Sequence, residues 1–163
     1  MVYYFAYGSN MDNEDLDIWC HSRGYSIVKF LDVTPAKLNN YKLSFNYYSK
    51  GRGGGAANIM ESQNDCVYGL LIEIDQNDLK TIRIKEGCYE DRPSIYNEID
   101  IGTERLIDHK LICNVKTYKV AKNYEKNQQQ LPTKYYMTLI VKNAKKYNFP
   151  VEYIKYLEAI KTQ

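Results

Sequence analysis

The stretch FAYGSNM (residues 5–11) decides how the rest of the chain is interpreted. With the residues before it, it forms the β-rich run VYYFAY (2–7), which predicts a strand. The small, turn-forming tripeptide Gly-Ser-Asn (8–10) ends that run. The following segment, MDNEDLDIWCHSRG (11–24), predicts a helix with acidic residues in its first turn and a glycine at its end. The tripeptide therefore joins a strand directly to a helix.

A turn of this kind leaves backbone N–H groups unpaired at the start of the helix. Such groups on Tyr7, Gly8, Ser9 and Asn10 would form a cradle for a carboxylate or for a polarised carbonyl oxygen. The alternative is a plain turn, in which Asn10 or Asp12 only caps the helix. The tripeptide alone leaves both interpretations open.

A second candidate site residue is Glu86, which ends the helix predicted over DQNDLKTIRIKEG (75–87). Leu79 and Ile82 lie seven and four positions before it, so Glu86 shares the core-facing side of this helix. Partial burial and the negative end of the helix dipole both disfavour its ionised form and are expected to raise its pKa. A raised pKa suits a carboxyl group that moves protons. A solvated glutamate in the last turn is the alternative.

Further strands are predicted over 26–33, 41–48, 56–61, 66–74, 94–101 and 110–120, and further helices over 133–148 and 150–160. A loop containing Pro35 is expected between the first two of these strands, GRGGG (51–55) is expected as a flexible turn, and the polar segment 123–130 is expected as a mobile connection. About seven strands with short helices between and after them indicate one α+β domain over residues 1–163, built on a mixed sheet or a small barrel.

The charge balance gives no electrostatic case for nucleic acid as the main partner, because 22 basic and 20 acidic residues leave a net charge of only +2. The lysines of KNAKKYNF (142–149) are interpreted as the solvated face of a packing helix. No apolar run reaches ~18 residues, and the N-terminus lacks a basic n-region, so neither a transmembrane helix nor a signal peptide is expected. These features predict a cytoplasmic protein without a membrane partner.

No metal or cofactor is expected. The segment GRGGGA (51–56) matches the glycine fingerprint of dinucleotide-binding folds, but a predicted strand follows it where that motif requires a helix. The chain has four cysteines, Cys20, Cys66, Cys88 and Cys113, and two histidines, His21 and His109. Because the cysteines lack CxxC spacing, they are interpreted as reduced, buried thiols and not as zinc ligands.

These segments, taken in order, resemble the γ-glutamylcyclotransferase family. YFAYGSNM (4–11) is similar to its N-terminal YGSN signature, and GRGGGAANIMES (51–62) to its glycine-rich strand entry. CVYGLLIEIDQNDLKTIRIKEG (66–87) is similar to its strand, helix and terminal Glu-Gly, and LPTKYYMTLIVKNAKKYNFPVEYIKYLEAI (131–160) to its closing helix pair. The resemblance spans the whole chain. It implies a small mixed β-barrel flanked by helices and a reaction without a cofactor.

The resemblance also implies the reaction and the residues that perform it. The α-amine of a γ-glutamyl amide attacks its own γ-carbonyl, a ring closes, and 5-oxoproline and an amine are released. Glu86 is then the general acid and base, and the amides of residues 7–10 bind the glutamyl oxygens. Tyr118, together with either Tyr96 or Tyr89, is expected to line the pocket.

Several points stay open at the level of sequence. The leaving group is an amino acid, an amine, or part of a larger intermediate or carrier protein. A catalytically silent small-ligand-binding or interaction module of the same fold is the alternative function, although such a module would have no need of both YGSN and Glu86. The oligomeric state is also open, with a homodimer as one option, and so is closure of 123–130 over the pocket as a lid.

Overall fold

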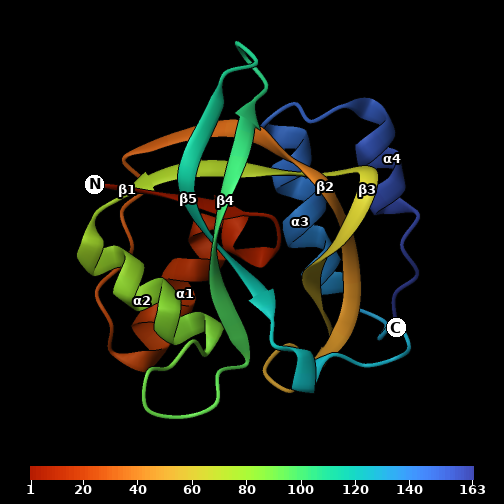
Figure 1. The fold of residues 1–163 in the computed structure, drawn as a ribbon. Coiled ribbons are helices and arrows are strands. Elements are labelled where there is room, and N and C mark those ends of the chain that lie inside the picture. The colour runs from red at the N-terminus through yellow and green to blue at the C-terminus, as the bar shows by residue number, and fades with distance from the viewer.

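The computed structural model describes residues 1–163, in which five strands form a closed barrel with helices around it (Figure 1). The elements follow in the order β1 (Val2–Ala6), η1 (Ser9–Met11), α1 (Asn13–Arg23), β2 (Asp32–Ser49), β3 (Gly54–Ile74), α2 (Gln76–Glu86), β4 (Tyr96–Arg105), β5 (Leu111–Val120), η2 (Lys122–Tyr124), α3 (Lys134–Lys146) and α4 (Val151–Glu158). Neighbouring strands pair in the order β1-β3-β2-β4-β5, and the expected α+β class with a small mixed barrel is confirmed.

The barrel is mixed because β1 has neighbours of both orientations. It pairs antiparallel with β3 along its whole length and parallel with β5, where Tyr4 lies opposite Lys116. This second pairing closes the sheet on itself, which leaves no open edge next to β1. One cluster of buried apolar side chains fills the barrel and continues beneath the helices.

The strand predicted over 26–33 and the loop predicted around Pro35 are both wrong. Residues 25–31 form no strand, and β2 runs without a break from Asp32 through Pro35. The carbonyl of Pro35 accepts a hydrogen bond from the N–H of Leu106. Because the nitrogen and the carbonyl of one strand residue point to the same neighbouring strand, the proline nitrogen also faces β4. Pairing with β4 begins only at the next residue, and a missing N–H is tolerated at such an edge.

The strands predicted over 56–61 and 66–74 are parts of one strand, β3. With the strand at 26–33 also absent, five strands replace the predicted seven. The pairing register between β2 and β3 shifts between Asn39 and Tyr41, and Asn40 adopts a positive φ of 61° there. The polar residues of β3 opposite this irregularity are mostly exposed. Their turn-like composition therefore marks a local change of register and not the end of a strand.

The predicted helix ends next to the candidate site are confirmed. Asp12 caps α1 by accepting from the backbone N–H of Asp15, and Asp75 caps α2. Gly24 and Gly87 end these two helices in the left-handed conformation, with φ of 74° and 63°. The start of α2 and its last residue, Glu86, are thus both set by local capping interactions.

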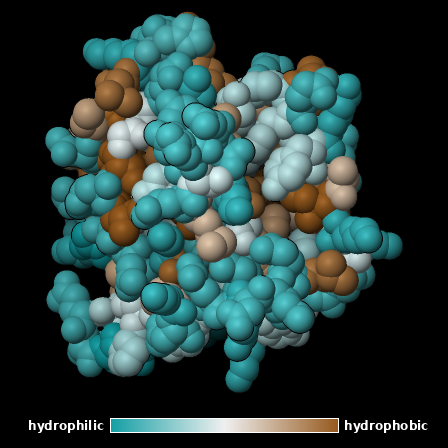
Figure 2. Space-filling model, turned by 45° about the vertical axis from the view of Figure 1, so that its right-hand side comes forward, coloured by the Kyte–Doolittle hydropathy of each residue, from teal (hydrophilic) through white to brown (hydrophobic).

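The helices lie on two sides of the barrel, with α1 and α2 toward one side and α3 and α4 toward the other (Figure 1). None of them combines the length and the apolar character that crossing a bilayer would require. Hydrophilic residues cover most of the face in Figure 2, and apolar residues appear there as small separate patches. All four cysteines are free, but only Cys20 is buried. Cys66 and Cys88 are partly exposed and Cys113 is exposed, so the expectation of buried thiols is confirmed for Cys20 alone.

A stability prediction follows from the close contact between β3 and β1. A Cβ on Gly69 would collide with the carbonyl oxygen of Ala6 and would lie 2.6 Å from the ring of Phe5. We expect Gly69→Ala to lower the free energy of unfolding by about 1–3 kcal/mol in urea denaturation. Gly51→Ala is the matched control, because its Cβ would meet nothing nearer than 3.9 Å. Equal stability of the two variants would contradict this account of the β1–β3 contact.

Candidate active site

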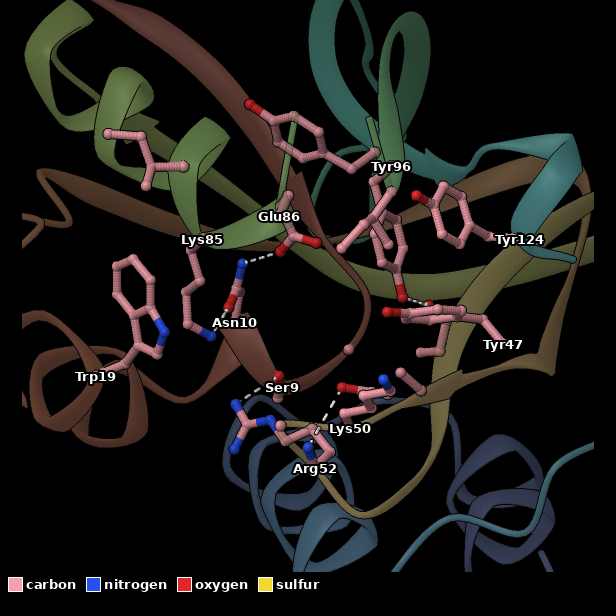
Figure 3. A pocket seen from close by; sticks show the side chains of 18 of the residues that line it. Ser9, Asn10, Trp19, Tyr47, Lys50, Arg52, Lys85, Glu86, Tyr96 and Tyr124 are labelled. Carbon is pink, nitrogen blue, oxygen red and sulfur yellow. Dashed lines mark hydrogen bonds between the residues drawn. The ribbon is translucent and has the colours of Figure 1, made fainter. Parts of the chain in front are cut away.

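A cavity of about 870 Å³ opens where β1 and α2 end (Figure 3). Its walls come from the turn after β1, the last turn of α2, the β2–β3 turn and the segment around η2. The residues that the sequence analysis assigned to the candidate site all line this cavity: Tyr7, Gly8, Ser9, Asn10, Glu86, Tyr96 and Tyr118. Segments that are far apart in the sequence therefore meet around one space.

The turn after β1 is the single 3-10 turn η1, which precedes α1. The N–H of Met11 donates to the carbonyl of Gly8 at 3.1 Å, and the N–H of Asp12 donates to that of Ser9 at 3.0 Å. These bonds leave the N–H groups of Ser9 and Asn10 unused within the turn, as expected for the first residues of any helix. The turn can therefore offer backbone donors to a ligand.

Gly8 lies where the turn approaches the opposite wall. A Cβ on this residue would lie 3.1 Å from the hydroxyl oxygen of Tyr136 and 3.2 Å from Cβ of Ala57. The same hydroxyl accepts a hydrogen bond from the N–H of Ala57 at 3.1 Å. Only a residue without a side chain fits this position with its neighbours undisturbed.

Asn10 connects this turn to the end of α2. Its Nδ2 donates to Oε1 of Glu86 at 2.5 Å and to the hydroxyl of Tyr4 at 3.0 Å. Its Oδ1 accepts from Nζ of Lys85 at 2.5 Å, which sets the orientation of the amide (Figure 3). No hydrogen bond within the protein involves Oε2 of Glu86. One carboxylate oxygen is thus anchored and the other is free.

Burial changes the proton affinity of both charged groups at the end of α2. It raises the pKa of Glu86, and the neighbouring Lys85, Asn10 and Arg52 offset this rise in part. Burial lowers the pKa of Lys85 to about 8, while the charge of Glu86 acts in the opposite direction. Nζ of Lys85 also lies 5.9 Å from the centre of the Trp19 ring. Glu86 therefore combines partial burial with a cation beside it.

Arg52 joins three segments of the site and was missed in the sequence analysis. Its guanidinium donates to both carboxylate oxygens of Asp15, at 2.9 and 2.5 Å, and to Oγ of Ser9 at 3.1 Å. It thereby ties the β2–β3 turn to α1 and to the turn after β1. The one available signal was a charged residue between glycines in GRGGG (51–55), a segment interpreted as a flexible turn or as a glycine loop whose backbone approaches a ligand, with no role for the arginine.

Tyrosines form much of the inner wall, and several of their hydroxyl groups are hydrogen-bonded to the protein. Tyr7 donates to the carbonyl of Tyr118 at 2.5 Å, and Tyr96 donates to the carbonyl of Ala57 at 2.8 Å. Burial raises the pKa of Tyr7, Tyr96 and Tyr136, so these phenols stay neutral. The tyrosine part of the wall is therefore aromatic and uncharged.

Two of the predicted tyrosine positions need a closer description. Tyr118 presents its ring to the cavity, but its hydroxyl donates to Glu98 at 2.8 Å, and Glu98 is paired with Arg83. Tyr96 and its competitor Tyr89 both line the cavity, so the geometry does not separate these two candidates. No group of three or more His, Cys, Asp and Glu side chains converges as metal ligands would.

Comparisons with known proteins give the family of this chain. The model of the AIG2-like family matches residues 66–157. The chain is 31% identical over 161 residues to γ-glutamylcyclotransferase of Bos taurus and 28% identical over 162 residues to that of Homo sapiens, and each alignment covers 96% of this chain and 77% of the relative. A solved structure of a γ-glutamyl cyclotransferase is similar with a TM-score of 0.80 and 26% identity, over 99% of this chain and 89% of the other.

The barrel and its cavity define a protein with the γ-glutamylcyclotransferase-like fold. The chain belongs to the γ-glutamylcyclotransferase family, and the resemblance noted in the sequence is confirmed. It is an enzyme of this type, and the family acts on small γ-glutamyl compounds.

The position of Lys85 leads to a prediction about proton affinity. Because its positive charge favours the ionised form of Glu86, we expect Lys85→Met to raise the pKa of Glu86 further. Titration of the labelled side-chain carboxyl carbon by NMR measures this pKa directly. Lys80→Met removes a lysine from an exposed position of the same helix and is expected to leave the titration unchanged. An unchanged midpoint in the Lys85 variant would refute the coupling.

Proposed function

We propose that this enzyme converts a γ-glutamyl amide into 5-oxoproline and a free amine, with Glu86 as the group that moves the protons. The observation that carries the proposal is the environment of the Glu86 carboxylate in the cavity. Oε1 is held by Asn10, and Oε2 has no partner in the protein. A free oxygen on a half-buried carboxylate is available to a substrate.

The first step is removal of a proton from the substrate. The α-amine of a γ-glutamyl group is an ammonium ion near neutral pH and cannot attack a carbonyl carbon in that form. Oε2 of Glu86 takes this proton. The raised pKa of Glu86 brings its proton affinity closer to that of the amine, which favours proton transfer in both directions.

The second step is ring closure on the γ-carbonyl carbon. The amine nitrogen bonds to this carbon, and negative charge develops on the carbonyl oxygen. The backbone N–H groups of residues 7–10 bind the glutamyl oxygens and stabilise this charge. The tyrosine wall holds the glutamyl chain in a folded shape and excludes water, which would otherwise compete as the nucleophile.

The last step is release of the amine. Glu86 gives its proton to the amide nitrogen, and the bond between that nitrogen and the γ-carbon breaks. Glu86 then takes the second proton from the ring nitrogen and passes it to the released amine, so that 5-oxoproline remains and the amine leaves as an ammonium ion. Neither water nor an oxidant is consumed. Tyr96 and Tyr118 act as parts of the wall in this scheme, because both hydroxyl groups already donate to protein acceptors.

Glu86→Gln tests the role of the carboxylate. The amide side chain keeps the shape and the bond from Asn10 but cannot accept the proton, so we expect release of 5-oxoproline to fall at least about 100-fold. The measurement is mass spectrometry on a panel of γ-glutamyl amino acids, amines and carrier-linked substrates. Glu90→Gln is the matched control, because Glu90 is exposed and does not line the cavity. Near wild-type turnover by Glu86→Gln would show that the assignment is wrong.

Gly8→Val tests the cradle. The added side chain would crowd the wall formed by Tyr136 and Ala57 and displace bound substrate, so we expect kcat/KM to fall about 10- to 100-fold. Gly8→Ala is expected to have a smaller effect in the same direction. Thermal unfolding of both variants separates a binding defect from a folding defect. Unchanged Michaelis parameters in a folded Gly8→Val protein would count against the cradle.

A further inference from the structure

Four basic side chains surround the outer part of the cavity. Arg23 ends α1, Lys50 lies in the β2–β3 turn, Arg92 lies in the α2–β4 loop, and Lys126 follows η2. All four residues are exposed, and none of them forms an ion pair. Arg92 lies over the face of the Tyr89 ring, with its guanidinium carbon 3.7 Å from the ring centre. The opening of the cavity is therefore positively charged.

No acidic side chain forms an ion pair with any of these four cations. Glu86 is the only acidic residue that lines the cavity, and it lies at the inner wall. Glu125, which precedes Lys126, accepts a hydrogen bond from Nδ2 of Asn58 at 3.2 Å and lines a second cavity, to which Lys126 also contributes. Glu90 and Asp91 are exposed in the same loop as Arg92 but do not line the cavity.

The inner basic residues differ from those at the opening, because each already has a polar partner. Lys85 donates to Asn10, and Arg52 is paired with Asp15. They contribute to the internal structure of the site. The four cations at the opening are therefore the ones free to meet an incoming ligand.

The direction of the substrate decides which of its parts meets these cations. In the proposed reaction, the glutamyl group lies against Glu86 and the turn of residues 7–10, at the inner wall. The leaving group then extends outward, between the β2–β3 turn, the α2–β4 loop and η2, which lie together at the lower end of the barrel in Figure 1. The cavity has about 870 Å³, near the upper end of the ~300–1,000 Å³ range of ligand pockets, which leaves room for more than one residue.

We infer that the leaving group of the preferred substrate carries several carboxylates, as in γ-glutamyl-glutamate and short γ-linked glutamate chains. This inference rests on the proposed function and adds the class of substrate. Each further γ-linked glutamate supplies one carboxylate to the ring of cations. A leaving group with additional positive charge, such as a diamine, is disfavoured at the same place.

The proposed cyclisation can act on a γ-linked glutamate chain more than once. The terminal α-amine bonds to the γ-carbon of its own residue, and the bond from that carbon to the next nitrogen breaks. Two protons leave the attacking amine in turn, and each passes through Glu86 to the departing nitrogen, which is released as an ammonium ion. The shortened chain then begins with a new free α-amine on a γ-linked glutamate, so the reaction can repeat until no γ-linkage remains.

The experiment compares four substrates: γ-glutamyl-glycine, γ-glutamyl-glutamate, the γ-linked glutamate trimer and a γ-glutamyl diamine. At low ionic strength we expect kcat/KM for the trimer to exceed that for γ-glutamyl-glycine by about tenfold or more. Added salt is expected to reduce this ratio, because the cations are exposed and easily screened. The trimer is expected to yield two equivalents of 5-oxoproline.

Variants that remove one positive charge test whether the preference for the trimer arises at the opening of the cavity. We expect Lys50→Gln and Lys126→Gln each to lower kcat/KM for the trimer by up to about fivefold, with a smaller change for γ-glutamyl-glycine. Lys146→Gln is the matched control, because it removes one exposed charge at the end of α3, away from the cavity lining. We expect kcat/KM of that variant to equal the wild-type value for each of the four substrates.

The possible results separate the two proposals. Equal kcat/KM for the glycine and glutamate substrates at low salt, or a preference for the diamine, would overturn this inference and leave the proposed function intact. Release of 5-oxoproline from none of the four substrates, in a protein shown to be folded, would overturn the proposed function itself.

Discussion

The placement of β1 between β3 and β5 is the constraint on which the rest of the structure depends. This five-residue strand pairs antiparallel with β3 along its whole length, and its parallel contact with β5 closes the barrel. Side chains of β5 strengthen the contact, since Thr117 donates to the carbonyl of Phe5 at 2.8 Å. Because both neighbours hold β1, the turn that follows it has a single position at the end of the barrel. The last turn of α2 lies at the same end of the barrel, and Asn10 connects it to the turn after β1.

The electrostatics of the site reflect a balance between burial and contact with neighbours. The surroundings that raise the pKa of Glu86 also lower that of Lys85, so burial disfavours the charged form of both groups while their opposite charges favour it. Arg52 and Asp15 show the other arrangement, in which two charges satisfy each other through two hydrogen bonds. A group paired in that way holds structure together. A carboxylate with one free oxygen remains available for chemistry.

Local interactions made part of the fold predictable. The helices next to the site begin and end close to the predicted residues, because Asp75 and Gly87 act on backbone groups within one turn of themselves. The strands were harder to predict, since their limits depend on distant partners. Considered by itself, Pro35 predicts the end of a strand. In the structure β2 continues through Pro35, because its pairing with β4 begins one residue later. The single strand β3 was divided in two for the same reason, because its polar stretch lies where the register with β2 shifts beside Asn40.

The sequence by itself determined the family, the class of fold, and the two segments that meet in the cavity, because a short motif and a capped helix carry these features locally. Only the tertiary structure decided that Lys85 orients Asn10, that Arg52 connects the β2–β3 turn to α1, and that Tyr136 faces Gly8. These contacts join elements that are separated by many residues along the chain. Their geometry follows from closure of the barrel and from the docking of α1, α2 and α3 around it. No sequence pattern within one segment predicts this arrangement.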